Sequence, residues 1–421
     1  MQQPNRRNFF RTSLGSVGLT LWNAQEWNLL LAGDQVPRPK LPVAAVVTVY
    51  HVNAHADVII GKIIEGWQQD GGPGPDLQLA SLYTDQVPSK DISRGLAKKH
   101  GFPIFNTIEG AITLGSNEVA VAGVLSIGEH GAYPSTADTH QEMFPRRRFF
   151  DEIIATFRKY NKSVPVFSDK HLAYAWLDAK HMYDTARTLG IPFMAGSSVP
   201  TTWRLPPVEL PIGSEITEVM MHGYGPLEAY GFHALEGMQC MVERRKGGET
   251  GVASVQAVKG DAIWQAEKDG RWSRELLNAI VGIGSATQRP ELDPTAIFYL
   301  IEYRDGLKAA VAMRTGLNKP FLISARVRGQ NEPVAINFAL QQGKPYEHFA
   351  HQVRAIEHMI HTGAPAYPVE RTLLTTGVLD SVMQSLAQGN KLLETPHLAV
   401  AYHPVDWPFA KGVPPPPRKV P

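Results

Sequence analysis

The segment that most constrains the fold is residues 42–67, in which an apolar run passes through a polar turn into a helical pattern. The run Pro42–Tyr50 is typical of a buried strand, and apolar residues recur at helical spacing in Ala56–Trp67. The turn between them has the sequence Tyr50-His51-Val52-Asn53-Ala54-His55-Ala56-Asp57. These features predict a strand–turn–helix unit, which belongs in a parallel sheet covered by helices.

The polar turn differs from the turn that usually binds a dinucleotide. Such a turn carries three glycines, because the backbone must come close to the pyrophosphate and the helix must pack tightly on the strand. The corresponding positions here are His51, Asn53 and Ala56. Together with His55, they place two imidazoles and a carboxamide where phosphates would lie. We therefore expect NAD(P) to bind weakly or not at all.

Strand and helix patterns alternate from residue 43 to about residue 200. The expected strands are Val43–Tyr50, Leu77–Asp85, Pro103–Phe105, Val119–Ile127, Val164–Ser168 and Pro192–Ala195. The expected helices are Ala56–Trp67, Lys90–His100, Thr107–Leu114, Arg148–Tyr160 and Tyr174–Leu189. This alternation predicts an α/β, Rossmann-like domain with a parallel sheet and helices on both faces.

The pattern changes to consecutive strands from about residue 205. The expected strands are Val252–Val258, Ile297–Tyr303, Leu307–Arg314 and Phe321–Val327, and the expected helices are Leu227–Arg244, Glu347–His361 and Thr372–Gln388. The change predicts a second, α+β domain with an open-faced, mainly antiparallel sheet. The expected division is 1–42 for a signal and linker, 43–204 for the Rossmann-like domain, 205–395 for the α+β domain, and 396–421 for a Pro-rich tail that is either disordered or a packing arm.

The N-terminal residues have the pattern of a twin-arginine export signal. Arg6-Arg7 precedes Phe9-Phe10, and a modestly apolar stretch, Thr12–Trp22, follows. The stretch is too short and too polar to span a membrane, which takes roughly 20 apolar residues. We expect export by the twin-arginine route to the periplasm or the extracellular space. The alternative is a basic N-terminal helix with chance arginines.

Composition excludes some partners. The chain has 421 residues, is 43% hydrophobic and carries a formal charge of +1, which suits two domains but lacks the basic surplus of a nucleic-acid-binding protein. The single cysteine, Cys240, excludes an internal disulfide and a thiolate metal cluster, and we expect it to be a small buried residue. We expect no nucleic-acid partner and no membrane span.

Polar residues follow four of the expected strands. They are His51 and His55 after the first strand, Asp85 at the end of the second, Glu129-His130 after the fourth, and Asp169-Lys170-His171 after the fifth. Because the carboxyl ends of parallel strands meet at one edge of a sheet, we expect the functional site at this edge.

Four stretches of the chain resemble the glucose-fructose oxidoreductase / inositol dehydrogenase (Gfo/Idh/MocA) family. They are Ile92–Phe105, Asp169-Lys170-His171 at the place of the family's Glu-Lys-Pro signature, Gly231–Glu236 at its Gly-x-His-x-x-Asp helix, and Leu379–Lys391 at its closing helix. The order of elements is similar over residues 43–395. The resemblance implies a Rossmann domain joined to an open-faced α+β domain, with a sugar as substrate.

The resemblance also implies roles for particular residues. Lys170 would face the cofactor and the sugar, beside Asp169, and His233 would be a sugar-facing acid or base. Asp85 would lie near the ribose, if NAD(P) binds. The chain departs from the family in the missing turn glycines, in Asp169 for Glu, and in His171 for Pro. We expect Lys170 and His233 to face each other across the cleft, and the alternative for Lys170 is an ordinary salt bridge with Asp169.

Imidazoles and a carboxylate at one edge also suit a divalent metal such as Zn, Mn or Fe. The candidate ligands are His51, His55, Glu129, His130 and His171. None has the tight spacing of a helix-borne metal site, so hydrogen-bonded turn residues are the alternative. The cofactor is unknown at this stage: a divalent metal is one candidate, and NAD(P) is disfavoured.

Substrate-binding candidates include the arginine run that follows Phe144-Pro145. A guanidinium grips a sugar carboxylate or sulfate with two hydrogen bonds, although a solvated helix start explains the run equally well. The candidates are Tyr50, Asn53, Tyr133, Arg146, Arg148 and Glu236. Four histidines are discounted, because they lie opposite the apolar face of the helix Glu347–His361 and are expected to be solvated. They are His348, His351, His358 and His361.

Three functions remain. The first is an exported carbohydrate-active enzyme, non-redox or metal-assisted, of lyase, hydrolase or epimerase type. The alternative is an NAD(P)-dependent sugar oxidoreductase with an altered phosphate-binding turn, and the second alternative is a non-catalytic carbohydrate-binding or partner protein. The missing glycines favour the first function, while Lys170 and His233 favour an enzyme. The expected ligand is a small molecule or oligosaccharide, and a homo-oligomer through the sheet of the second domain is considered.

Overall fold

The computed structural model describes residues 39–283, 293–314 and 321–418. The fold described below is that of the unit Lys40–Pro421. The predicted twin-arginine signal lies outside the described residues. Among the residues that are described, no helix combines the length and the apolar character needed to cross a membrane.

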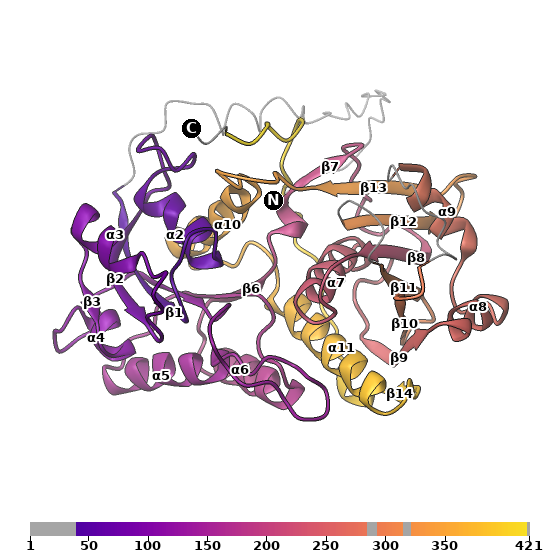
Figure 1. Cartoon of the computed structure of the whole chain (residues 1–421), viewed down its shortest axis with the longest axis horizontal. Coiled ribbons are helices and arrows are strands. Elements are labelled where there is room, and N and C mark those ends of the chain that lie inside the picture. The colour runs from indigo at the N-terminus through magenta and orange to yellow at the C-terminus, as the bar shows by residue number, and fades with distance from the viewer. Residues whose placement is uncertain (1–38, 284–292, 315–320, 419–421) are drawn as a thin grey trace, which may run out of the picture. The chain divides into compact units, whose positions relative to one another are not determined.

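The first sheet has six parallel strands in the order β3-β2-β1-β4-β5-β6 (Figure 1). The strands are β1 Leu41–Val47, β2 Leu77–Thr84, β3 Ile104–Phe105, β4 Gly123–Ile127, β5 Val166–Asp169 and β6 Phe193–Gly196. Each lies within a run that the sequence alternation predicts or at most two residues beyond it. The reversal of strand order next to β1 is that of a Rossmann-like sheet, which confirms the predicted class of this part.

Helices cover both faces of the first sheet. Side chains of β1 alternate between the faces, so Val43 and Val47 pack with α2 (His55–Ile64) and α10 (His348–Thr362), while Val46 packs with the opposite helices. Those opposite helices are α4 Ile108–Thr113, α5 Arg146–Lys159 and α6 Trp176–Thr188, and α3 is Ser93–His100. Helix α10 lies beside α2 although almost 300 residues separate them in the sequence (Figure 1).

The second sheet has eight strands in the order β14-β9-β10-β11-β8-β12-β13-β7. The strands are β7 Trp203–Leu205, β8 Ile216–Gly223, β9 Val252–Lys259, β10 Ile297–Tyr303, β11 Lys308–Met313, β12 Phe321–Val327, β13 Val334–Ala339 and β14 Leu393–Glu394. Strands β8 and β11 pair in parallel and the remaining neighbours pair antiparallel. The mainly antiparallel second sheet is therefore confirmed, although the sequence patterns did not predict β7, β8, β13 or β14.

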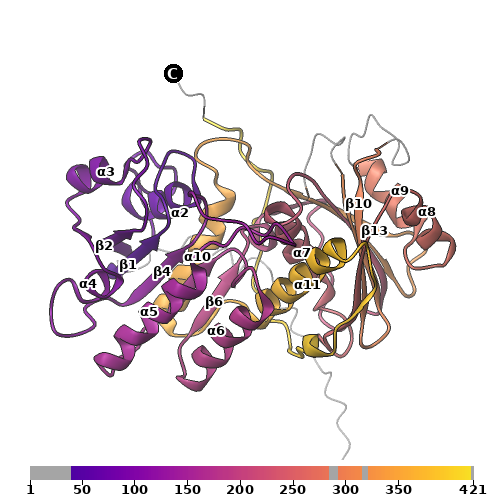
Figure 2. The ribbon, with the colours of Figure 1, turned by 60° about the horizontal axis from the view of Figure 1, so that its bottom comes forward.

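The two faces of the second sheet carry different helices. Helices α7 (Ala229–Val242) and α11 (Val369–Ala387) pack on one face, as Figure 2 shows. Helices α8 (Asp261–Lys268) and α9 (Arg274–Ile283), which the sequence patterns did not predict, cover part of the other face around Trp272. A homo-oligomer formed through this sheet stays a prediction.

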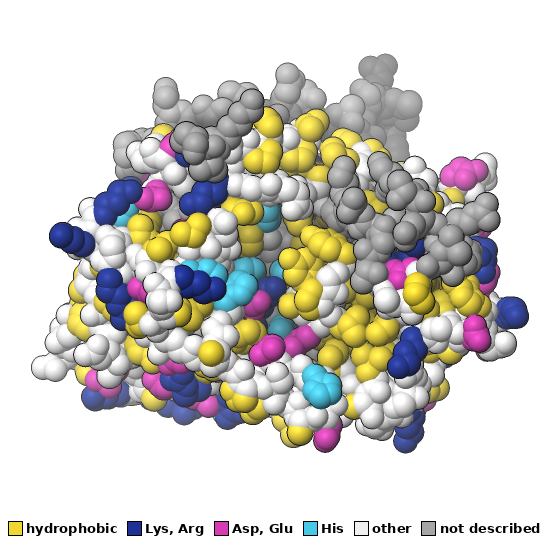
Figure 3. All heavy atoms as spheres, in the orientation of Figure 1, with side chains coloured by type: hydrophobic (Ala, Val, Ile, Leu, Met, Phe, Trp, Pro, Cys, Tyr) yellow, Lys and Arg dark blue, Asp and Glu magenta, His cyan; other side chains and the backbone are white. Residues whose placement is uncertain are grey.

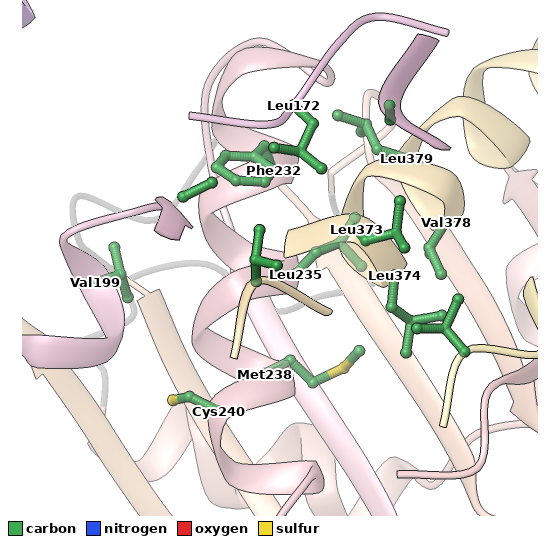
Figure 4. Close-up of a cluster of buried hydrophobic side chains, with 14 of the residues drawn as sticks. Leu172, Val199, Phe232, Leu235, Met238, Cys240, Leu373, Leu374, Val378 and Leu379 are labelled. Carbon is green, nitrogen blue, oxygen red and sulfur yellow. The ribbon is translucent and has the colours of Figure 1, made fainter. Parts of the chain in front are cut away.

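One hydrophobic cluster runs from the helices of the first sheet to those of the second. In Figure 4, Leu172 from the loop after β5 lies beside Phe232 of α7 and Leu379 of α11. Cys240 is buried in the same helix α7, as expected, and burial raises the pKa of its thiol to about 12. The two sheets therefore share a core.

The described part of the Pro-rich tail, up to residue 418, packs on the protein. The Ala410 N–H donates to the Thr201 carbonyl at 3.0 Å, and the Arg418 N–H donates to the Lys344 carbonyl at 2.7 Å. The Gln341 side chain donates to the Pro415 carbonyl at 3.1 Å. Of the two alternatives for the tail, the packing arm is the one observed.

Candidate functional site

Lys170 and His233 meet at the carboxyl edge of the first sheet. Strand β5 ends at Asp169, and Lys170 takes a left-handed backbone conformation with φ 68°, which is uncommon for a residue with a side chain. Its ammonium group donates to Nε2 of His233 on α7 at 2.7 Å. The Nδ1 atom of His233 lies 2.6 Å from Oγ of Ser197, which follows β6. The pair is thus held between two strand ends of the first sheet and helix α7, which packs on the second sheet.

A layer of paired charges lies under this pair. The charged layer consists of Glu129, Arg146, Lys170, His171 and Glu228, all of them buried. Arg146 donates to Glu129 at 2.7 Å, and the Lys170 ammonium lies 3.4 Å from the same carboxylate. Arg146 also lies 2.9 Å from Nε2 of His171, which in turn is 3.5 Å from Glu228. Buried charges of this kind persist only when they are paired.

The electrostatics of the layer fix the protonation of its members. Burial alone would raise the pKa of Glu129, but the charges of Lys170 and Arg146 hold that pKa well below its usual range. Burial, reinforced by Arg146, lowers the pKa of His171 to about 4. Burial, reinforced by Lys170, also lowers the pKa of His233 well below its usual value. At neutral pH a carboxylate therefore faces two cations, and both imidazoles are neutral.

His55 and Asp169 form a second polar pair, next to the charged layer. Nδ1 of His55, in the first turn of α2, lies 2.7 Å from Oδ2 of Asp169 at the end of β5. The Asp169 side chain is 1% exposed and that of His55 is 14% exposed. Asp169 thus pairs with His55, and Lys170 pairs with Glu129. The alternative of a plain Lys170–Asp169 salt bridge is not what the structure contains.

A cavity of about 160 Å³ opens in front of these pairs. This volume is many times the roughly 10–15 Å³ that one ordered water needs. Its lining comes from α2, the loop after β6, α7, β12 and the segment before α10, and consists of Asn53, His55, Val58, Ser198, Val199, Tyr224, Tyr230, His233, Phe321, Leu340, Gln341, Gln342, Tyr346, His348 and Phe349. Figure 3 shows histidine side chains gathered beside a hollow on this face. Uncharged aromatic and amide groups predominate in the described part of the lining.

His348 corrects the prediction of a solvated histidine face on α10. The side chain is 6% exposed and lines the cavity, and burial lowers the pKa of its imidazole to about 3. His351 packs edge-on against Trp203 at 5.1 Å between ring centroids, and His361 lies 3.0 Å from the Asp76 carbonyl. The prediction failed because α10 is covered on more than its apolar side.

The turn after β1 keeps two features of a phosphate-binding turn without its glycines: a left-handed residue and uncapped N–H groups. Asn53 has a φ of 63°, in the left-handed region that glycine usually supplies and that Asn tolerates. The helix start at Ala54 has no side-chain cap, and the N–H groups of His55 and Ala56 have no acceptor among the described residues. Free N–H groups at a helix N-terminus suit a phosphate. The turn residues therefore fit the pyrophosphate of a dinucleotide.

Asp85 lies at the end of β2, where a Rossmann-like fold places the ribose of a dinucleotide. Its carboxylate accepts from Tyr83 and Tyr133 at 2.7 Å each, and from Arg148 at 2.6 Å. Burial alone would raise the pKa of Asp85, but Tyr133 and Arg148 lower it, so the group is a carboxylate. A ribose hydroxyl that binds here must share or displace these donors.

Several predicted site residues lie away from the cavity. Tyr50, Arg146 and Glu236 are each at most 1% exposed, so a ligand in the cavity would not touch them. Tyr133 and Arg148 bind Asp85 instead. The metal-ligand candidates form no complete metal site: the described residues contain no group of three or more His, Cys, Asp and Glu that would hold a metal ion. The rings of His51 and His55 do approach that of His130, with centroids 5.6 and 5.7 Å away, whereas Glu129 and His171 both contact Arg146.

The structure also adds residues that sequence reasoning missed. Ser197 contacts His233, and Tyr230, Phe321 and Tyr346 line the cavity. Tyr230, Phe321 and Tyr346 come from elements outside the first sheet, whose approach to it is set by tertiary structure. The only sequence signal was the position of Ser197 directly after a predicted strand, which matches that of Lys170.

Comparisons with known proteins bear on the fold. No protein-family model matches the chain, and no curated protein matches its sequence. Among solved structures, GenD2 from gentamicin A biosynthesis in complex with NAD is 14% identical, with a TM-score of 0.53 over 85% of this chain and 97% of that chain. Scyllo-inositol dehydrogenase from Lactobacillus casei is 11% identical, with a TM-score of 0.52 over 85% of this chain and 98% of that chain. A putative myo-inositol dehydrogenase from Sinorhizobium meliloti is 13% identical, with a TM-score of 0.51 over 84% and 99%.

These likenesses confirm the resemblance to the Gfo/Idh/MocA family at the level of the fold. They also correct one expectation. The sequence argument disfavoured NAD(P), whereas GenD2, which shares the fold, was solved with NAD, and the other two structures are named as inositol dehydrogenases, one of them putative. The argument failed because it assumed that only glycine could take the left-handed backbone conformation that the turn needs. Asn53 takes this conformation, with a φ of 63°.

Proposed function

We propose that this protein is an NAD(P)-dependent oxidoreductase that acts on a hydroxyl group of a sugar or polyol. The observation that carries the proposal is the Lys170–His233 contact of 2.7 Å, at the carboxyl edge of a Rossmann-like sheet and behind a cavity. The likeness to dehydrogenases supports it. The non-redox carbohydrate enzyme that the turn sequence favoured has no comparable support.

The residues of the site have different roles in the proposed oxidation of an alcohol. The ring of His233 lines the cavity, and the charge of Lys170 lies directly behind it. A positive charge at this end stabilises the negative charge that develops on the substrate oxygen. Ser197 and the carboxylate of Glu129 hold the two groups in place. When NAD(P) is bound, its nicotinamide supplies the two-electron acceptor that the reaction requires.

The cavity lining suits a sugar or polyol. Tyr230 and Phe321 present ring faces at 26° to each other, with centroids 6.5 Å apart, next to His233. Such faces pack against the C–H groups of a sugar, while amides such as Gln341 offer hydrogen bonds to its hydroxyls. The lining and the likeness of fold both support a sugar or polyol as the substrate class.

Nicotinamide binding and Lys170 together test the proposal. Titration with NAD+ and NADP+ should give binding of at least one of them, and a panel of inositols and aldoses should give reduction of the bound cofactor, read at its absorbance. Lys170→Ala should lower kcat by about 10²–10⁴. Lys180→Ala is the control, because this lysine pairs with Asp184 on the surface and should leave turnover unchanged.

Circular dichroism and thermal unfolding show whether Lys170→Ala is folded, and Lys170→Arg keeps the charge if it is not. Absence of binding for both nicotinamide cofactors, or full turnover in folded Lys170→Ala, would contradict the proposal.

We further infer export by the twin-arginine route. The support is the Arg6-Arg7 pattern alone. Fusion of residues 1–42 to a reporter that is active only after export tests it, with Arg6→Lys and Arg7→Lys together as the variant that should stay inside the cell.

A further inference from the structure

His233 has no ring nitrogen available for a ligand in this structure. Lys170 donates to Nε2, and Nδ1 contacts Ser197. An ammonium has donors only, so Nε2 of His233 is the acceptor and its lone pair is occupied. For His233 to exchange a proton with a substrate, Lys170 would first have to leave. The proton of a substrate hydroxyl therefore needs another acceptor.

His55 has the opposite arrangement. Its Nδ1 atom lies 2.7 Å from the Asp169 carboxylate, and a carboxylate can only accept, so Nδ1 carries the proton. In the neutral ring the lone pair then lies on Nε2, for which no partner is found among the described residues. The His55 ring lines the cavity. A lone pair is thus available at the cavity wall.

Packing holds the His55 ring in place. It stacks on His233 at 6.2 Å between centroids and 27° between planes, and it meets Phe349 edge-on at 5.2 Å. Asp169 is buried at the end of β5, a rigid element. A carboxylate that fixes the tautomer and orientation of an imidazole is the arrangement that hydrolases use to prepare a general base. The same arrangement stands here in a dehydrogenase fold.

We propose that His55, oriented by Asp169, is the general base that removes the hydroxyl proton of the substrate. The proposal rests on the proposed oxidoreductase function. The O–H bond breaks and an N–H bond forms at Nε2 of His55. The electron pair of the neighbouring C–H bond passes as a hydride to the nicotinamide cofactor, so the alcohol becomes a carbonyl and NAD(P)+ becomes NAD(P)H. In the reverse direction His55 returns the proton.

This role differs from that of Lys170 and His233. The Lys170 ammonium supplies positive charge behind the neutral His233 ring at one end of the cavity, whereas His55 accepts the proton of the substrate. Asp169 contacts the base and not the substrate, so it is a positioning residue.

Chemical rescue distinguishes a base from a structural histidine. His55→Ala should lower kcat by about 10²–10⁴ with a much smaller change in KM, and imidazole added to the buffer should restore part of the lost rate. Asp169→Asn should lose a comparable rate that imidazole does not restore, because His55 is still present but in the wrong tautomer. The matched controls are His181→Ala and Asp151→Asn, a surface pair at 2.9 Å that should leave kcat unchanged.

A measurement without turnover tests the same pair. Nitrogen-15 NMR of the ring nitrogens in the full chain should show His55 protonated at Nδ1 and unprotonated at Nε2, and Asp169→Asn should change this pattern. An Nε2-protonated His55 in the wild-type protein would overturn the proposal. So would wild-type kcat in His55→Ala, or a loss in His55→Ala that imidazole leaves unchanged.

The two proposals fail separately. A wild-type protein that reduces no nicotinamide cofactor overturns the oxidoreductase function and, with it, the role of His55 as a base. Turnover that persists in His55→Ala overturns only the role of His55.

Discussion

The charged layer and the cavity lining are adjacent but differ in composition: the first consists mainly of paired buried charges, and the second mainly of uncharged aromatic and amide groups. In the charged layer, Glu129 lies between the cations Arg146 and Lys170, all of them buried. In the lining, aromatic rings and amides surround an open space, and the His55 imidazole keeps a free nitrogen. In the first region the charged groups are paired with one another, while the second leaves open space for a ligand.

The difference separates stability from chemistry. Removing one member of a buried ion pair leaves an uncompensated charge, so changes in the charged layer should act mainly on folding. Changes in the lining remove groups that contact a ligand and should act mainly on binding or rate. Lys170 belongs to the charged layer and also serves the cavity, so its variants should show both effects.

The largest effect should come from Glu129→Ala. It leaves Arg146 and Lys170 buried without their shared carboxylate, and we expect the free energy of unfolding to fall by about 3–5 kcal/mol. Urea denaturation measures it. The control is Glu152→Ala, which removes a surface partner of Arg148 and should cost less than about 1 kcal/mol. Equal falls in the free energy of unfolding of the two variants would contradict the claim that ion pairs in the charged layer matter more for stability than those on the surface.

An intermediate effect should come from Gly196→Ala, at the border of the two regions. Gly196 has a φ of 120°, and a Cβ there would lie 2.7 Å from Oγ1 of Thr372. We expect a loss of about 1–3 kcal/mol from strain and crowding. Gly190→Ala is the matched control, because it has a φ of 62° and nothing within 4 Å of the added Cβ. A larger loss at Gly190 would show that the border is not tightly packed.

The smallest effect should come from His348 in the lining. Burial lowers its pKa to about 3, against about 6.5 in an unfolded chain, so the unfolded state binds the extra proton first as the pH falls. The stabilisation is complete above about pH 6.5 and is lost on acidification, by about 1 kcal/mol between pH 6.5 and 5.5 for this one group.

Denaturation of the wild-type protein and of His348→Gln at pH 7.5 and at pH 5.5 measures this loss. The variant should lose about 1 kcal/mol less stability on acidification than the wild type does. Replacement of the exposed His403 by Gln should leave the wild-type pH dependence unchanged. An identical pH dependence in His348→Gln would mean that His348 is already solvated.

The sequence predicted the parts of the molecule that local periodicity determines. Alternating strands and helices gave the first sheet and the edge at which Lys170 lies, and the Gly231–Glu236 stretch placed His233 on α7. Strand β8 lies at the centre of the second sheet but was not predicted, because its central, buried half includes Met220, Met221 and His222, which are weak signals of a strand.

Other features depended on information that no local pattern holds. The backbone conformation of Asn53 is a property of the folded turn, and residue type alone suggested that the turn had changed its function. His348 faces the cavity because two different parts of the protein cover α10, whereas helical periodicity shows a single apolar side. The pairing of His55 with Asp169 joins positions that are 114 residues apart.

Helix α10 also affects how the chain folds during synthesis. Its residues Val353, Ile356 and Met359 complete the core on the α2 face of the first sheet, yet the ribosome makes them after almost all of the second sheet. A nascent chain that ends near residue 204 would expose that apolar face, and exposed apolar surface favours aggregation. The core on this face of the first sheet can therefore be completed only after the C-terminal third of the chain has been made. Residues 43–204 alone should make a poor expression fragment, because the core of the first sheet is complete only after translation of residue 362.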